Sequence, residues 1–121
     1  MNICLVDDSR FQLMQTSQML TDLGHDVTSF VVSREALESL KEKEYDCLVS
    51  DLLMPEMDGE QLVLELKKFK PNLPVIVITA DIQKSVEKRC NDIGINFFLN
   101  KPVTKDQLDP VLSKIKLEAG E

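Results

Sequence analysis

The stretch YDCLVSDLLMPEMDG, residues 45–59, decides the fold. Its apolar run Cys47-Leu48-Val49 is typical of a buried strand, and this strand leads to a single acid, Asp51. A loop that contains Pro55 follows, and a helix is expected from Gly59 onward. In an open α/β sheet, ligands bind at the carboxyl ends of the strands. Asp51 is therefore expected to lie at a binding edge.

Strand and helix patterns alternate along the whole chain around this stretch. Continuous apolar runs are typical of strands in a parallel sheet, and apolar spacings of three and four predict helices. Right-handed crossovers then give a five-stranded, doubly wound parallel sheet with helices on both faces. The other strands are expected at 3–6, 27–31, 75–78 and 97–99, and the helices at 10–23, 33–40, 58–69, 82–93 and 104–115.

Helix ends are marked by small polar residues and glycine. N-caps are expected at Ser9, Ser33, Asp58 and Thr104, because their side-chain oxygens can accept from free backbone N–H groups. Pro110 breaks a local rule, because it lies inside the last expected helix and cannot donate a backbone hydrogen bond. That helix is expected to start late or to kink.

Composition bounds the class of protein. A chain of 121 residues is one domain by length, with no linker or second domain in its pattern. The net charge of −7 argues against direct binding to nucleic acid or to an anionic membrane. No apolar run is long enough to span a bilayer, and no secretory signal is expected, because a strand pattern follows Met1 directly without a basic leader. Cys4 and Cys47 are interpreted as small buried hydrophobes, and a cytoplasmic location is expected.

Functional side chains end four of the five expected strands. They are Asp7-Asp8, Asp51, Thr79 and Lys101, and all should meet at one edge of the sheet. Clustered carboxylates without His or Cys favour Mg²⁺, Mn²⁺ or Ca²⁺. A carboxylate can accept a phosphoryl group when a metal and a cation neutralise its charge. Asp51 is the best acceptor candidate, and Thr79 and Lys101 are placed to hold the phosphoryl oxygens.

These residues also carry a family resemblance. The sequence has Asp7-Asp8 after an apolar strand, Asp51 followed by the 54–59 pattern MPEMDG, Thr79-Ala80, and Lys101-Pro102. In this order they resemble the receiver domain of two-component response regulators, most closely the stand-alone chemotaxis type. The resemblance covers essentially residues 1–121 and implies a single flavodoxin-like (βα)5 receiver domain.

The resemblance implies a metal site. Asp51 would be the phosphorylated aspartate and would give one carboxylate oxygen to Mg²⁺, for which Mn²⁺ can substitute. Asp8 would bind the ion directly, Asp7 largely through water, and Leu53 through its backbone carbonyl.

It also implies a switch. Thr79 and Lys101 would contact the phosphoryl oxygens, and Thr79 and Phe98 would move when the group arrives. The Lys101-Pro102 bond would be cis. In this family two positions tune dephosphorylation, and here they are Leu53 and Asp81. These two residues do not determine how long the phosphorylated state would last.

The expected function is a phosphorylation switch. A histidine kinase or phosphotransfer protein would supply the group, and the protein would promote its own phosphorylation and dephosphorylation without being an enzyme for a separate substrate. The face made by the fourth helix, fifth strand and fifth helix would then bind a target protein. With no output domain expected in residues 1–121, output would occur in trans, as in chemotaxis or a phosphorelay; a fragment of a longer regulator is the alternative.

Two other functions stay open at this point. A phosphatase of the haloacid-dehalogenase type also uses Asp, Thr, Lys and Mg²⁺, but its nucleophile ends the first strand. A non-phosphorylated interaction domain is the third possible function.

Other notable residues are interpreted as structural. We expect His25 at the surface, Met54 and Met57 in loop packing, and Phe97 and Phe98 on opposite faces of their strand.

Overall fold

The structure is a computed structural model that describes residues 1–80 and 83–119. Five parallel strands form one sheet in the order β2-β1-β3-β4-β5. This is the expected doubly wound arrangement, with β1 and β3 adjacent at its centre. The elements are β1 Asn2–Val6, α1 Arg10–Asp22, β2 Asp26–Phe30, α2 Ser33–Glu42, β3 Cys47–Asp51, α3 Gly59–Lys67, β4 Val75–Thr79, α4 Lys84–Asp92, β5 Phe97–Asn100 and α5 Lys105–Glu118.

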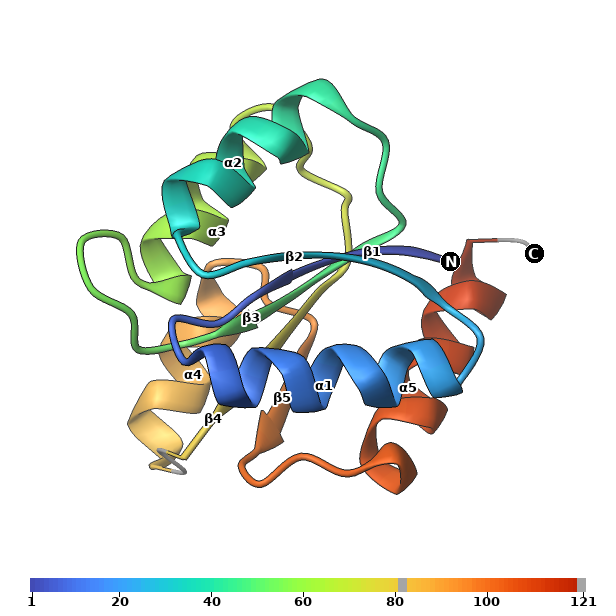
Figure 1. The fold of residues 1–121 in the computed structure, drawn as a ribbon. Coiled ribbons are helices and arrows are strands. Elements are labelled where there is room, and N and C mark those ends of the chain that lie inside the picture. The colour runs from blue at the N-terminus through green and yellow to red at the C-terminus, as the bar shows by residue number, and fades with distance from the viewer. Residues whose placement is uncertain (81–82, 120–121) are drawn as a thin grey trace.

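Helices cover both faces of the sheet (Figure 1). The apolar side chains of α2, α3 and α4 pack on one face, and those of α1 and α5 pack on the other. Met1 and the end of α5 lie near each other at the amino ends of the strands. The carboxyl ends of the strands form the opposite edge, where the expected site residues lie.

Alternation along the strands builds the two cores. On β3, Leu48 points into the α2–α3–α4 core and Val49 into the α1–α5 core. On β5, Phe98 and Phe97 divide in the same way, which confirms their predicted opposite facing. Every residue of β3 and β4 is buried, so the central strands have apolar surroundings on both sides.

Side-chain caps fix the starts of three helices. Ser9 accepts a hydrogen bond from the Gln12 backbone, and Asp58 and Thr104 each form a capping box. The expected cap at Ser33 is wrong. The cap residue is Val32, which makes no side-chain bond there, and buried Ser33 is already the first residue of α2.

The last helix also differs from expectation. It begins at Lys105, directly after its cap residue Thr104, and continues through Pro110 to Glu118, so a late start is wrong. The capping box fixes the first turn before the proline is reached. Beyond it, Leu108, Leu112 and Ile115 are buried and hold the helix against the sheet.

The single histidine lies at the surface, as predicted, but is partly covered. His25 is half-buried, and its Nδ1 lies 3.1 Å from the amino group of Met1. Met57 is buried and Met54 packs against the core, as predicted. Ile82, the first residue of the helix expected at 82–93, lies outside the described residues.

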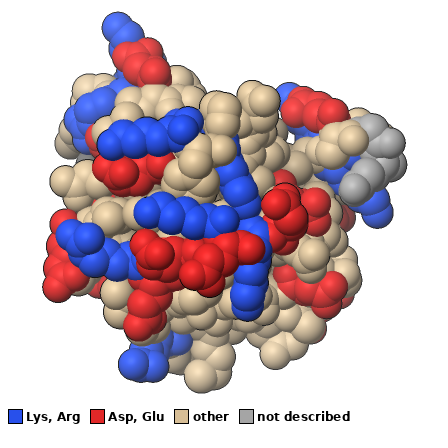
Figure 2. Space-filling view, turned by 90° about the horizontal axis from the view of Figure 1, so that it is seen from above, with Lys and Arg blue, Asp and Glu red and all other residues tan. Residues whose placement is uncertain are grey.

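The charged residues do not gather by sign on the face above the sheet. Figure 2 shows acidic and basic side chains interleaved there. Two of the ion pairs are short-range contacts, Lys41 with Glu38 within α2 and Lys68 with Glu65 at the end of α3. These charges form a solvated surface rather than an extended basic patch. None of the described helices has both the length and the apolar character needed to cross a membrane.

Candidate functional site

Three carboxylates meet at the carboxyl edge of the sheet. Val6 of β1 pairs in register with Ser50 of β3, so the next residues, Asp7 and Asp51, come side by side. Together with Asp8 they offer carboxylate oxygens that all lie within 4.8 Å of one another. Asp7 is 6% exposed and Asp51 9% exposed, whereas Asp8 is open to solvent. The predicted acidic cluster is therefore present.

The turns around the acids are held by local hydrogen bonds. The backbone N–H of Ser9 donates to Oδ1 of Asp7 at 2.9 Å, which ties this acid to the start of α1. The Ser50 hydroxyl donates to the Asp51 carbonyl at 2.8 Å. Gly59 N–H donates to the Leu52 carbonyl at 2.8 Å and closes the loop that follows Asp51. These hydrogen bonds hold the backbone around Asp7 and Asp51 in place.

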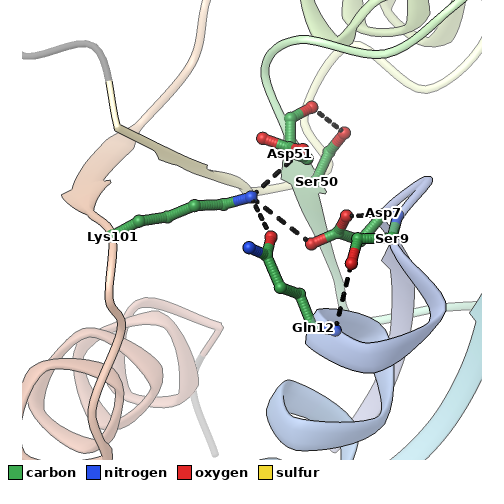
Figure 3. A network of polar contacts seen from close by, with 6 residues as sticks. All are labelled: Asp7, Ser9, Gln12, Ser50, Asp51 and Lys101. Carbon is green, nitrogen blue, oxygen red and sulfur yellow. Dashed lines mark hydrogen bonds and ion pairs between the residues drawn. The ribbon is translucent and has the colours of Figure 1, made fainter.

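Lys101 reaches across the edge from the end of β5 (Figure 3). Its Nζ lies 3.2 Å from Oδ2 of Asp51 and 3.6 Å from Oδ2 of Asp7. It also contacts Oε1 of Gln12, which extends from the first turn of α1. The Lys101-Pro102 peptide is cis, as the resemblance implied, and the Lys101 N–H donates to the Thr79 carbonyl at 2.8 Å. The cation thus bridges β5, α1 and the two buried acids.

Burial dominates the ionisation of Asp51. Loss of solvent raises the pKa of its carboxyl, and the nearby Asp7 charge acts in the same direction. Lys101 acts in the opposite direction, both as a charge and as a hydrogen-bond donor. The net shift is upward, so a single lysine does not offset the burial of this acid. Additional positive charge near Asp51 would therefore favour its ionised form.

The remaining predicted residues lie at or near the same edge. Thr79 ends β4 and is 1% exposed. Phe98 pairs with Val77 across β4–β5, is half-buried, and packs on the α4 side of the sheet. The side chain of Leu53 is 66% exposed and does not enter the core. Asp81 lies outside the described residues.

A cavity of about 340 Å³ opens beside the acids, between α1 and the β5–α5 connection. Asp7 and Lys101 line its polar end, and Thr16, Ile78 and Val103 line its deeper wall. The cavity leads to the reactive edge of the sheet. It is large enough for a small group to approach the acids from the α1 side.

Sequence analysis missed one member of this site. Gln12 is an exposed residue of α1 and belongs to no motif, yet its amide contacts Lys101. By contrast, Cys4 and Cys47 are buried, as predicted. Burial raises the pKa of the Cys4 thiol to about 12 and raises that of Cys47 and Cys90 as well, which disfavours the reactive thiolate.

Known proteins resemble this chain over most of its length. The family model for the response regulator receiver domain matches residues 3–113. The chemotaxis protein CheY of Thermotoga maritima is 31% identical, over 93% of this chain and 95% of its own length. The transcriptional regulatory protein GlrR of Escherichia coli is 37% identical over 88% of this chain, but the match spans only 24% of GlrR.

Solved structures agree in fold. A receiver domain protein from Clostridium thermocellum superposes with a TM-score of 0.92 at 25% identity, covering 98% of this chain and 96% of the other. The receiver domain of the sensor histidine kinase PA1611 from Pseudomonas aeruginosa has a TM-score of 0.86 at 27% identity, covering 93% and 94%. That structure is described with magnesium in its active-site cleft. The chain belongs to the response regulator receiver domains, which act in phosphorylation-based two-component signal transduction.

Proposed function

We propose that Asp51 accepts the phosphoryl group, from a phosphohistidine on a kinase or phosphotransfer protein. The observation that carries this proposal is the placement of Asp51 between a cation and two further acids, with Lys101 Nζ at 3.2 Å. Asp7 adjoins α1 and is tied to the Ser9 backbone, whereas Asp51 ends a strand beside a tight loop. This difference favours Asp51 as the acceptor.

Asp7, Asp8 and Asp51 fit a divalent metal ion. One carboxylate oxygen from each acid lies within 4.8 Å of the other two, and oxygen-only ligands suit Mg²⁺, with Mn²⁺ as a substitute. The Leu53 carbonyl is the fourth proposed protein ligand. When bound, Mg²⁺ neutralises negative charge on the acids and on the transferring group.

The proposed transfer forms one bond and breaks one. A carboxylate oxygen of Asp51 forms a bond to phosphorus, the bond from phosphorus to the donor imidazole nitrogen breaks, and that nitrogen keeps the electron pair and is reprotonated from solvent. Thr79 and Lys101 contact the phosphoryl oxygens. Later attack by water on phosphorus releases phosphate and restores the Asp51 carboxylate. The chain promotes both steps on itself and has no separate substrate.

The donor protein docks along α1 in this proposal. Phe11 and Met14 are each 70% exposed on α1, where they line a shallow surface hollow together with Gln15 and Met19. Gln15 and Met19 also line the cavity beside Asp7 and Lys101. Large apolar side chains exposed together mark interaction surfaces. A phosphohistidine carried by a protein must come within bonding distance of Asp51, and this apolar face borders that route.

The output face is formed by α4, β5 and α5. Arrival of the phosphoryl group draws in Thr79, and Phe98 on the neighbouring strand follows. The nine-residue helix α4 buries only Val86 and Cys90, so it is lightly held. A target protein, in a chemotaxis or phosphorelay pathway, binds this face; the 31% identity to a chemotaxis protein CheY supports this choice.

The test is intact mass after incubation with acetyl phosphate. We expect a gain of one phosphoryl group that requires Mg²⁺, is abolished by EDTA and is absent in Asp51→Asn. Asp58→Asn, in the α3 cap outside the acid cluster, is the matched control and should still be labelled. Labelling of Asp51→Asn at the wild-type level would show that another residue is the acceptor. Repeated turnover of a small phosphomonoester would instead support a phosphatase.

A further inference from the structure

Gln12 provides one of three contacts to the Lys101 ammonium. Its Oε1 is the partner, while Asp51 and Asp7 lie at 3.2 and 3.6 Å. Charge-assisted N–H···O contacts are normally about 2.7–2.9 Å long. Both carboxylate distances are longer than this, and the neutral amide of Gln12 supplies a further acceptor for the cation from outside the acid cluster.

The backbone places Gln12 for this contact. Its N–H donates to the Ser9 hydroxyl at 3.3 Å, which fixes the residue in the first turn of α1. Its side chain then points from α1 toward the end of β5, where Lys101 enters (Figure 3). The contact joins residues 89 positions apart in the chain and closes one wall of the site.

An amide oxygen differs from a carboxylate in one important respect. A divalent ion held by Asp7 and Asp51 would draw on the same carboxylates that Lys101 contacts, so the ion and the lysine would compete for them. An amide acceptor outside the acid cluster can hold the lysine while the ion occupies the acids. The charge on the lysine then remains at the edge of the site, where an incoming phosphoryl group needs it.

We propose that Gln12 is a positioning residue that holds Lys101 beside the acid cluster and thereby keeps the Asp7 and Asp51 oxygens accessible to the divalent ion. Gln12 acts only through Lys101 and touches neither the ion nor the phosphoryl group. The inference rests on the proposed function, because it assigns Lys101 and the acids their proposed roles.

The test is the Mg²⁺ dissociation constant, measured by titrating the ¹H–¹⁵N amide resonances around Asp7 and Asp51. Gln12→Met keeps side-chain length and helix propensity but removes the acceptor. Without it, Lys101 is free to pair more closely with the acids, so Mg²⁺ affinity should fall roughly three- to tenfold. Gln18→Met, an identical change at an exposed position farther along α1, should leave it unchanged.

A double-mutant cycle isolates the route through Lys101. Lys101→Met should strengthen Mg²⁺ binding, because a competing cation is removed, and adding Gln12→Met to that variant should change nothing further. An unchanged constant in Gln12→Met, or an equal loss in the Lys101→Met background, would overturn the inference. The Mg²⁺ dissociation constant is measured without phosphorylation. Failure of acetyl phosphate to label the wild type would therefore contradict the proposed function without affecting the result for Gln12.

Discussion

Lys101 Nζ lies 3.2 Å from Asp51 Oδ2, and yet the pKa of the Asp51 carboxyl is raised. The cause is that Asp51 is 9% exposed and shares its surroundings with Asp7, so loss of solvent outweighs the single cation. In the absence of metal, the folded protein therefore holds an ionised Asp51 at an energetic cost.

Replacing Asp51 by Asn should stabilise the metal-free protein at neutral pH. An acid whose pKa is higher in the folded state binds more protons there than in the unfolded chain, so its contribution to stability falls as pH rises through that interval. The gain in Asp51→Asn should thus grow as pH rises above the ordinary carboxyl value of 3.8, reaching on the order of 1 kcal/mol. Urea unfolding in EDTA across that pH range measures it.

Solvent-exposed Asp8 supplies the control for this prediction. Asp8→Asn also removes one negative charge from the cluster but relieves no burial, so its effect should be smaller. If Asp51→Asn lowers stability at neutral pH, the ion pair with Lys101 stabilises the Asp51 carboxylate by more than its burial destabilises it, which would contradict this prediction.

Gly59 cannot carry a side chain without moving the loop that holds Asp51. A Cβ on Gly59 would lie 2.6 Å from the Asp51 carbonyl oxygen and 3.0 Å from the Leu52 Cα, and both are backbone atoms. Gly59→Ala should therefore destabilise the fold by about 1–3 kcal/mol and slow labelling by acetyl phosphate, because the acceptor is displaced. Thermal unfolding and intact mass measure the two effects.

Gly24→Ala is the comparison that separates the effect of backbone strain from the effect of displacing the Asp51 loop. Gly24 has φ +94°, but no atom lies within 4 Å of a Cβ placed there. It should cost about 1 kcal/mol through backbone strain and leave the labelling rate of folded protein unchanged. Equal labelling rates for Gly59→Ala and Gly24→Ala would show that the 51–59 loop tolerates the side chain.

The site was predictable wherever it depends on strand ends. Parallel strands bring their carboxyl ends to one edge, so Asp7, Asp51 and Lys101 could be grouped before any distance was known. The cis bond at Lys101-Pro102 followed from the family resemblance rather than from spacing.

The rest depended on side-chain reach and local backbone geometry. Gln12 contacts Lys101 only because α1 lies beside the β5–α5 connection, a relationship that requires the strand order and the packing of both helices. Ser33 was expected as a cap from its residue type, but α2 starts one residue earlier and buries it. His25 follows a helix-ending glycine, and its contact with Met1 is invisible to local pattern.

His25 should titrate below its ordinary pKa. Burial lowers the pKa of the imidazole, and the positive amino group of Met1 and Lys116 act in the same direction, while Asp109 and Asp26 oppose them. The unfolded chain then binds the proton more readily, so stability from this group is present above the ordinary value of 6.5 and is lost as pH falls through the folded value. Since the chain has one histidine, its ring resonance titrates without overlap.

His25→Gln is the variant that checks the link to stability. It should remove the part of the pH dependence that lies just below 6.5, seen as a flatter plot of unfolding free energy against pH. A ring pKa at or above the ordinary value would contradict the burial argument.

The ion pair of Arg89 with Glu60 should hold α4 against α3 without contributing much to global stability. Arg89 Nε lies 2.9 Å from both Glu60 oxygens, and its Nη2 lies 2.7 Å from Oε1. Because Arg89 is 57% exposed, breaking the pair should cost less than about 1 kcal/mol overall. Yet α4 has only Val86 and Cys90 buried, so the local effect should be visible: amide exchange in α4 of Arg89→Gln should quicken roughly two- to fivefold.

Lys68→Gln makes the matched comparison, since it breaks an exposed pair with Glu65 at the end of α3 and has no partner on α4 among the contacts described. Its α4 amides should exchange at the wild-type rate, and the amides of β3 should be unaffected in both variants. If Arg89→Gln leaves α4 exchange unchanged, the sheet-facing contacts of Val86 and Cys90 are sufficient to hold the helix. If exchange quickens in α4 alone, the Arg89–Glu60 pair specifically restrains α4, a helix of the proposed output face that must move during switching.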